Sequence, residues 1–152
     1  MEIRSGGLDH PAVAALLRLH LDGMAQHSPA ASVHALNLAG LAAPEVSFWA
    51  AWEGDELLGC AALKALGDGE AEIKSMRTAP GQLRRGVASA LLAHLLGVAR
   101  ELGYRKIGLE TGSGHAFAPA HALYRRFGFA DCAAFGDYPA DDPFSRFMSL
   151  TL

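Results

Sequence analysis

Two adjacent arginines and a glycine stand at the start of a helical pattern, where they are placed to bind an anion. The stretch 75–92 reads SMRTAPGQLRRGVASALL, with Arg84 and Arg85 followed by Gly86 and Ala88. A helix N-terminus presents unpaired backbone N–H groups and the positive end of the helix dipole, and both suit phosphate. Cations in the first turn oppose that dipole, so a bound anion would explain the two arginines. A surface turn with solvated arginines is the alternative, and the local sequence leaves both open.

The composition indicates one domain, 1–152, that is long enough to enclose a core. A net charge of −3 argues against nucleic acid as a partner. The cysteines Cys60 and Cys132 lack the spacing of a disulfide framework or a zinc site, so we expect free thiols and no metal. The N-terminus has no signal-peptide pattern, and no apolar run is long enough to span a membrane, which favours the cytoplasm.

Apolar periodicity and turn residues predict the element order β-α-α-β-β-β-α-β-α-β-β. Helices are predicted after an N-cap at Asp9 with Pro11 in the first turn, over 30–39, from Val87 to Leu102 and over 118–127. Strands are predicted over 1–4, 46–53, 57–66, 71–78, 106–111, 129–135 and 146–151. Three hairpin-joined strands precede a βαβ unit, so we expect a mixed sheet with helices on both faces.

Two motifs and the strand between them resemble the GNAT superfamily of acyl-CoA-dependent N-acetyltransferases, over nearly the whole chain. The first, LRRGVA at 83–88, is similar to the family pattern Gln/Arg-x-x-Gly-x-Gly/Ala, except that Leu83 stands where Gln or Arg is usual. The second, AHALYRRFGF at 120–129, is similar to A-x-x-L-Y-x-x-x-G-F. Phe117 stands seven residues before Tyr124, where many members carry Asn. Three further segments resemble a bacterial, small-molecule-type subset of this superfamily: 72–78, 109–112 and 147–148.

The resemblance implies an α/β structure of the GNAT fold, with a mixed central sheet of about six to seven strands flanked by about four helices. The strands 71–78 and 106–111 would splay apart and admit CoA between them. Acetyl-CoA is the implied cosubstrate, with pantetheine paired to the first of these strands and the pyrophosphate bound by backbone N–H groups. The implied cofactor-binding residues are Met76, Arg77, Thr78, Leu83, Arg84, Arg85, Gly86, Val87, Ala88, Ser89, Phe117, Ala120 and Tyr124.

Tyr124 and Glu72 are the implied catalytic residues. By resemblance the Tyr124 hydroxyl faces the CoA sulfur as general acid, whereas the residues alone also fit an aromatic ring packed on a helix face. Glu72 is a candidate general base for the incoming ammonium, and its alternative is a strand carboxylate that is solvated or paired with Lys74 or Lys106. Glu110 reaches the same gap from the partner strand and is a second candidate, and a reaction with no single decisive base is a third.

The histidines give weaker predictions. For His115 and His121, beside the glycine- and serine-rich loop, a solvated position is favoured over a place in the acceptor pocket. His20, His27 and His34 lie in the N-terminal helical region, which in the family borders the acceptor, and their spacing indicates no metal site.

Three functions are compatible with these motifs. The first is transfer of an acetyl group from acetyl-CoA to the amine of a small molecule, by direct attack in a ternary complex. In the second, a protein N-terminus or lysine is the acceptor; in the third, the domain binds acyl-CoA as a sensor without catalysis. Tyr124 favours an enzyme, whereas Leu83 and Phe117 favour the sensor. The acidic loop 137–144 would attract a cationic amine or form an ordinary solvated turn. A homodimer is compatible with the apolar late strands.

Overall fold

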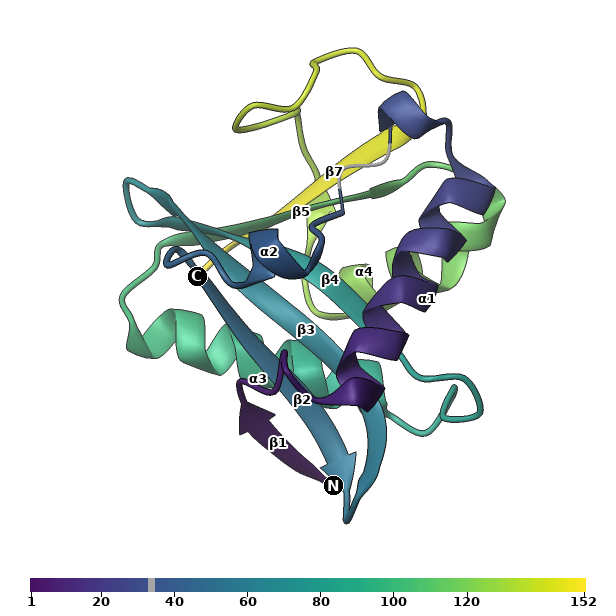
Figure 1. Cartoon of the computed structure of the whole chain (residues 1–152). Helices are drawn as coiled ribbons and strands as arrows, with labels where there is room; N and C mark the ends of the chain where they lie inside the picture. The colour runs from purple at the N-terminus through teal and green to yellow at the C-terminus, as the bar shows by residue number, and fades with distance from the viewer. Residues whose placement is uncertain (33–34) are drawn as a thin grey trace.

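The protein, described by a computed structural model over residues 1–32 and 35–152, is built on a seven-stranded mixed sheet. The strands lie in the order β1-β2-β3-β4-β5-β7-β6 (Figure 1). All neighbours are antiparallel except β4 and β5, which are parallel. The strands are β1 (Glu2–Ser5), β2 (Val46–Glu53), β3 (Glu56–Gly67), β4 (Glu70–Thr78), β5 (Lys106–Gly112), β6 (Ala130–Asp131) and β7 (Ser145–Thr151).

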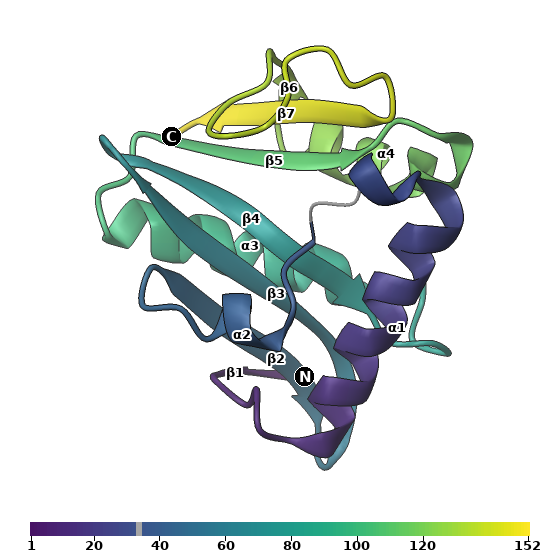
Figure 2. The same ribbon diagram turned by 45° about the horizontal axis from the view of Figure 1, so that its top comes forward.

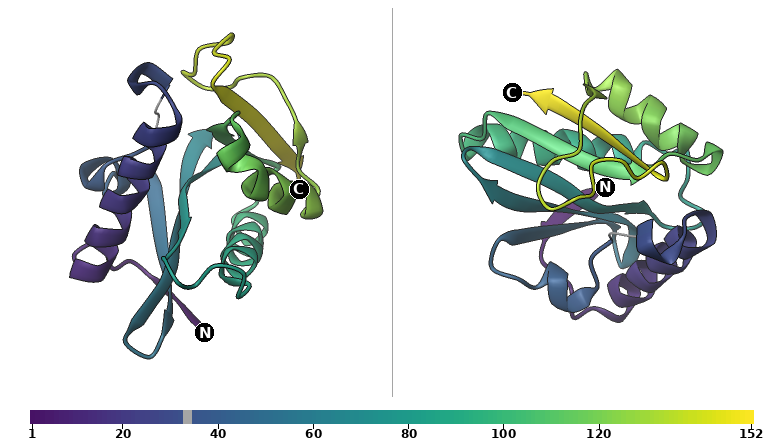
Figure 3. Two further views of the ribbon diagram at one scale, coloured as in Figure 1. Left: turned by 90° about the vertical axis from the view of Figure 1, so that its right-hand side faces the viewer. Right: turned by 90° about the horizontal axis from the view of Figure 1, so that it is seen from above.

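Four α-helices in the described part of the chain cover the two faces of the sheet. Figure 3 shows α1 (Pro11–His27) and α2 (Leu38–Leu41) on one face, and α3 (Val87–Glu101) and α4 (Ala118–Arg126) on the other. The short 3-10 turns η1 (Ala30–Ser32) and η2 (His115–Phe117) precede α2 and α4. Helix α1 has Pro11 in its first turn as predicted, but its N-cap is His10 and not Asp9, because the His10 ring accepts a hydrogen bond from the Ala12 N–H.

Each face of the sheet has its own hydrophobic core, because successive side chains of a strand point to opposite faces. On β2, Trp49 and Ala51 belong to the core under α3 and α4, whereas Phe48, Ala50 and Trp52 belong to the core under α1 and α2. Helix α3 contributes its apolar face to the first core through Val87, Leu91, Leu92, Leu95, Leu96 and Ala99. The two cores therefore fix α1 and α3 on opposite sides of the central strands.

The parallel strands β4 and β5 separate halfway along their length. They are paired from Glu70 and Lys106 to Ile73 and Leu109, and the pairing ends there, while β5 continues beside β7 as far as Gly112. Figure 2 shows the two strands diverging toward α1 and α4. This confirms the predicted mixed sheet, its strand number and the splayed strand pair.

Two predicted elements were wrong in extent. The helix expected over 30–39 is replaced by η1 and the short α2, because the Asn37 side chain accepts a hydrogen bond from the Gly40 N–H and starts a new helix; its residues 33–34, with His34, lie outside the described residues. The strand expected over 129–135 is only β6, because the chain leaves β7 after the Cys132 N–H bonds to the Phe147 carbonyl. No helix among residues 1–32 and 35–152 is both long and apolar enough to cross a bilayer.

Candidate active site

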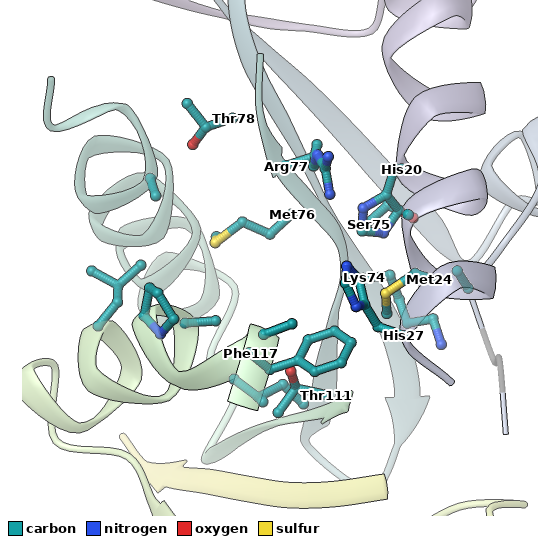
Figure 4. A pocket seen from close by; sticks show the side chains of 18 of the residues that line it. His20, Met24, His27, Lys74, Ser75, Met76, Arg77, Thr78, Thr111 and Phe117 are labelled. Atoms are coloured by element: carbon teal, nitrogen blue, oxygen red, sulfur yellow. The ribbon is translucent and has the colours of Figure 1, made fainter. Parts of the chain in front are cut away.

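A pocket of about 660 Å³ lies where β4 and β5 separate, with α1 on one side and η2 and α4 on the other (Figure 4). Its size is typical of small-molecule and cofactor sites. Its lining residues come from α1, from β4 and the turn that follows it, from β5, and from the segment 116–124. The splay of two strands therefore creates one space that several distant segments share.

A bulge turns β4 in the middle of this pocket. Between the paired positions 74 and 77, Ser75 and Met76 both lie opposite the single residue Ala61. Ser75 has φ +54°, in the left-handed region that is costly for a residue with a side chain. Past the bulge, Met76 extends toward α4 whereas Arg77 lies against α1 (Figure 4). One strand thus supplies side chains to both halves of the pocket.

The Tyr124 hydroxyl faces β4 from α4. Its oxygen is 3.9 Å from Sδ of Met76, and the residue lines the pocket although it is only 8% exposed. The ring packs at 5.8 Å from that of Phe129, so the packed aromatic expected from the residues alone is also present. Burial raises the pKa of Tyr124 to about 12, and the phenol is therefore protonated at neutral pH and able to donate a hydrogen bond.

The N-terminus of α3 is left without a side-chain cap. Its N-cap residue is Gly86, with φ +79°, and the first N–H that bonds back to it is that of Ala90. The N–H groups of Val87, Ala88 and Ser89 are consequently unpaired within the helix, as an anion site requires. The turn before them is held together by polar side chains, since Arg85 donates to Gln82 and Gln82 donates to Glu56.

The predicted cofactor-binding residues fall into two groups. Those that line the pocket are Met76, Arg77, Thr78, Leu83, Ala88, Phe117, Ala120 and Tyr124. Those at or beside the α3 N-terminus, outside the pocket lining, are Arg84, Arg85, Gly86, Val87 and Ser89. Arg84 is exposed, and the Val87 side chain is buried in the core, so Val87 presents only its backbone.

Glu72 is buried and does not belong to the pocket lining. The carboxylate is 3.4 Å from the Lys74 ammonium and accepts a hydrogen bond from the Tyr138 hydroxyl, and the residue is 2% exposed. Lys74 also donates to Tyr138 at 2.6 Å and itself lines the pocket. Of the two alternatives for Glu72, the pairing with Lys74 is present. Glu110 does line the pocket, from β5.

Helix α1 contributes the part of the site that the motifs did not locate. His20, Gly23, Met24 and His27 line the pocket opposite Tyr124, together with Ser75 of the bulge. The sequence placed α1 on the acceptor side only as a region, because apolar spacing identifies the buried face of a helix and not the few polar residues at its rim. His115 is exposed, and His121 is neither solvated nor in the pocket lining, since it is buried with Nε2 2.8 Å from the Gly112 carbonyl.

Phe117 reaches the pocket because β5 ends in a glycine. A Cβ atom at Gly112 would lie 2.1 Å from the Phe117 ring, so only a glycine leaves room for the ring at that position. The aromatic side chain that stands at the family's usual Asn position therefore forms an apolar wall. Within residues 1–32 and 35–152, no group of three or more His, Cys, Asp and Glu side chains is arranged to hold a metal ion.

The sequence matches known proteins over most of its length. The model of the acetyltransferase (GNAT) family matches residues 13–129. The chain is 52% identical to the uncharacterized N-acetyltransferase YedL of Escherichia coli (strain K12), over 99% of this chain and 94% of that protein. It is 48% identical to the uncharacterized N-acetyltransferase YsnE of Bacillus subtilis (strain 168), over 100% of both. The IAA acetyltransferase of Azospirillum brasilense is 37% identical, over 82% of this chain and 80% of that protein.

Solved structures share the fold. One from Klebsiella pneumoniae has a TM-score of 0.79 and 27% identity, over 99% of this chain and 97% of that chain. A Bacillus subtilis acetyltransferase in complex with CoA has a TM-score of 0.71 at 19% identity, over 99% and 98% of the two chains, and supports the fold alone. The matched residues, the relatives and the splayed strands agree: the chain belongs to the acetyltransferase (GNAT) family and is an acyl-CoA-dependent acetyltransferase.

Proposed function

We propose that the protein transfers the acetyl group of acetyl-CoA to the amine of a small molecule by direct attack in a ternary complex. The observation that carries this proposal is the continuity of the pocket. Leu83 and Ala88 at the α3 end, Tyr124 in the middle and His20 on α1 all line the same space. A donor bound along β4 and an acceptor bound against α1 would therefore meet beside Tyr124, and such positioning supplies much of the rate.

In this proposal the residues divide the work between donor and acceptor. The backbone N–H groups at the α3 N-terminus bind the pyrophosphate, with Arg84 and Arg85 beside them, and the free edge of β4 beyond Ile73 pairs with pantetheine. Tyr124 donates a hydrogen bond to the sulfur as negative charge develops on the leaving thiolate. Glu72 is paired with Lys74 and does not line the pocket, so we propose that its carboxylate takes the proton of the acceptor ammonium through an intervening water.

A covalent acyl-enzyme is not favoured by the cysteines. Cys60, under the bulge, is fully buried and its thiol donates a hydrogen bond to the Ser75 carbonyl. Burial raises the pKa of Cys60 to about 12, so the thiolate that a nucleophile requires does not form at neutral pH. Neither Cys60 nor Cys132 lines the pocket. Direct transfer is the simpler route.

The test is a screen of acceptors with free CoA thiol as the readout. The purified protein and acetyl-CoA are mixed with small amines, with peptides that carry a free N-terminus or lysine, and with IAA, because one relative is named for it. Turnover of small amines, with intersecting lines when both substrates are varied, supports the proposal. Turnover of peptides alone would favour the second function, and tight acetyl-CoA binding without any turnover would favour the sensor. Homodimer formation and a cytoplasmic setting stay predictions from the sequence.

A further inference from the structure

We propose that the acceptor is a small amino acid, in which a carboxylate accompanies the amine to be acetylated, and that Arg77 binds the carboxylate. The inference rests on the proposed function for the acetylation step and adds the class of the substrate. It assigns the Arg77 side chain to the acceptor, whereas the motif resemblance placed this residue with CoA. The backbone of Arg77 can still contact CoA, as the motif resemblance implies.

The Arg77 side chain is a charged group in the pocket, and no partner for it is found among residues 1–32 and 35–152. It lies against α1, where a Cβ atom at Gly23 would be 3.3 Å from one terminal guanidinium nitrogen. Within the described residues it forms no salt bridge and no side-chain hydrogen bond, although it lines the pocket. A guanidinium presents a planar pair of donors that matches a carboxylate, so an anionic group is the natural occupant of this corner.

Two further polar side chains at the same corner also lack partners. Nδ1 of His20 and Oγ of Ser75 are buried with no hydrogen-bond partner among residues 1–32 and 35–152, and both residues are 8% exposed. Both line the pocket (Figure 4). The positive charge of Arg77 adds to burial in lowering the pKa of His20, which shows that the two side chains are close. Because buried polar atoms are normally paired, these two mark a corner of the pocket where the described protein groups do not satisfy the hydrogen-bonding capacity.

One acidic residue of the pocket suits the amine end of an amino acid. Asp22, exposed on α1, lines the pocket. It offers negative charge to an ammonium on its way in, while Arg77 and Lys74, which also line the pocket, disfavour a second cation and favour the neutral amine that attacks. Diamines and polyamines therefore fit this charge pattern less well than a molecule with one amine and one carboxylate.

The experiment compares each free amino acid with its C-terminal amide, which keeps the side chain and the amine but removes the negative charge. CoA release gives kcat/KM for each pair, and calorimetry gives binding to the CoA-loaded protein independently of turnover. We expect kcat/KM for the preferred amino acid to exceed that for its amide by at least about tenfold. Arg77→Met should remove this preference by raising KM for the acid alone, and Arg77→Lys should restore part of it.

A helix glycine supplies a second, independent variant. Gly23→Ala would place a methyl group against the guanidinium, whereas Gly97→Ala on α3 is the matched control because a Cβ there has no atom within 4 Å. Alanine favours a helix over glycine, so neither change should lower the melting temperature. Gly23→Ala should nevertheless raise KM for the amino acid several-fold and leave CoA affinity unchanged, which a purely structural effect would not produce.

The outcomes separate the two proposals. Equal turnover of acids and amides by the wild type, or an acid preference that survives in Arg77→Met, overturns the amino-acid inference and leaves the acetyltransferase function in place. If no amine is acetylated but amino acids bind the CoA-loaded protein in an Arg77-dependent manner, the carboxylate site stands and the proposed reaction fails. If amino acids neither bind nor react, while other amines are acetylated, the inference is wrong and the proposed function is retained.

Discussion

At the scale of single residues, the site depends on side chains whose proton affinity is changed by burial. Tyr124 and His20 line the same pocket from different helices. For both residues, burial and not a neighbouring charge is the main cause of the pKa shift. Burial keeps the Tyr124 phenol protonated and the His20 imidazole neutral. Both therefore serve as hydrogen-bonding groups at neutral pH, beside a cationic Arg77.

Replacing Tyr124 with Phe removes the hydroxyl that faces Met76 while it retains the ring that packs on Phe129. We expect kcat to fall by about 100-fold, the usual effect of losing a positioned proton donor. Acetyl-CoA affinity, measured by calorimetry, should change little. Tyr104→Phe is the control, since Tyr104 is half-buried and outside the pocket lining. A Tyr124→Phe enzyme with wild-type kcat would show that the hydroxyl has no catalytic role.

His20 makes stability dependent on pH. Its pKa is lowered to about 4 in the folded chain, so a proton binds more readily to the unfolded chain, with its ordinary value of 6.5. The contribution of the neutral His20 to the free energy of unfolding, about 3 kcal/mol, is complete above pH 6.5. It is lost as the pH falls toward 4. Urea unfolding across this range should show a smaller loss for His20→Gln than for the wild type, with the exposed His115→Gln as control. Parallel curves for His20→Gln and the wild type would contradict this.

At the scale of elements, the proposed anion site is a property of a helix end and of the turn that leads into it. The arginine pair that drew attention in the sequence does not line the pocket, and Arg85 is bonded to Gln82 within the turn. Gly86 is the N-cap residue of α3. It has a left-handed backbone conformation and no side chain that could cap the first N–H groups. If an anion binds there as we propose, the backbone carries the geometry of the site, and Leu83, which is exposed and lines the pocket, need not supply a polar side chain.

Gly86→Ala tests that geometry. No atom lies within 4 Å of the new Cβ, so the expected cost comes from the positive φ alone. We expect a loss of about 1 kcal/mol of stability in urea unfolding, together with weaker acetyl-CoA binding because the first-turn N–H groups are displaced. Gly97→Ala, in the middle of α3, should leave acetyl-CoA affinity unchanged and should not lower stability, because alanine favours a helix over glycine. Unaltered acetyl-CoA affinity in a folded Gly86→Ala protein would argue against the backbone anion site.

At the scale of the whole molecule, the loop between β6 and β7 is hydrogen-bonded to the central sheet. Tyr138, between β6 and β7, bonds to both Glu72 and Lys74 of β4. Its ring also packs on Phe135 and Phe147. Segments that are more than sixty positions apart in the sequence are thereby joined around one buried carboxylate. The loop is thus bonded to β4, one of the strands that form the pocket, and the acidic residues of the loop did not predict this.

Tyr138→Phe should loosen this connection. Removing the hydroxyl leaves the buried Glu72 carboxylate with one partner fewer, at a cost of about 1–3 kcal/mol. Hydrogen exchange should become faster over residues 132–144, and the midpoint of urea unfolding should fall. Tyr104→Phe again serves as the matched control. Exchange rates in the loop equal to those of the wild type would mean that the aromatic packing alone holds it.

The sequence by itself determined the element order, the mixed sheet, the family and the α3 anion motif, because periodicity, turn residues and short motifs are local properties of the chain. It did not indicate the bulge at Ser75, which depends on how β4 pairs with β3, and it left open whether Glu72 is a base or is paired with Lys74, whereas the structure shows the pairing and adds a hydrogen bond from Tyr138. Only the tertiary structure brought Arg77, His20 and Ser75 to one corner of the pocket. Residues from a helix and a strand so far apart meet only when the two cores fix α1 against the splayed edge of β4.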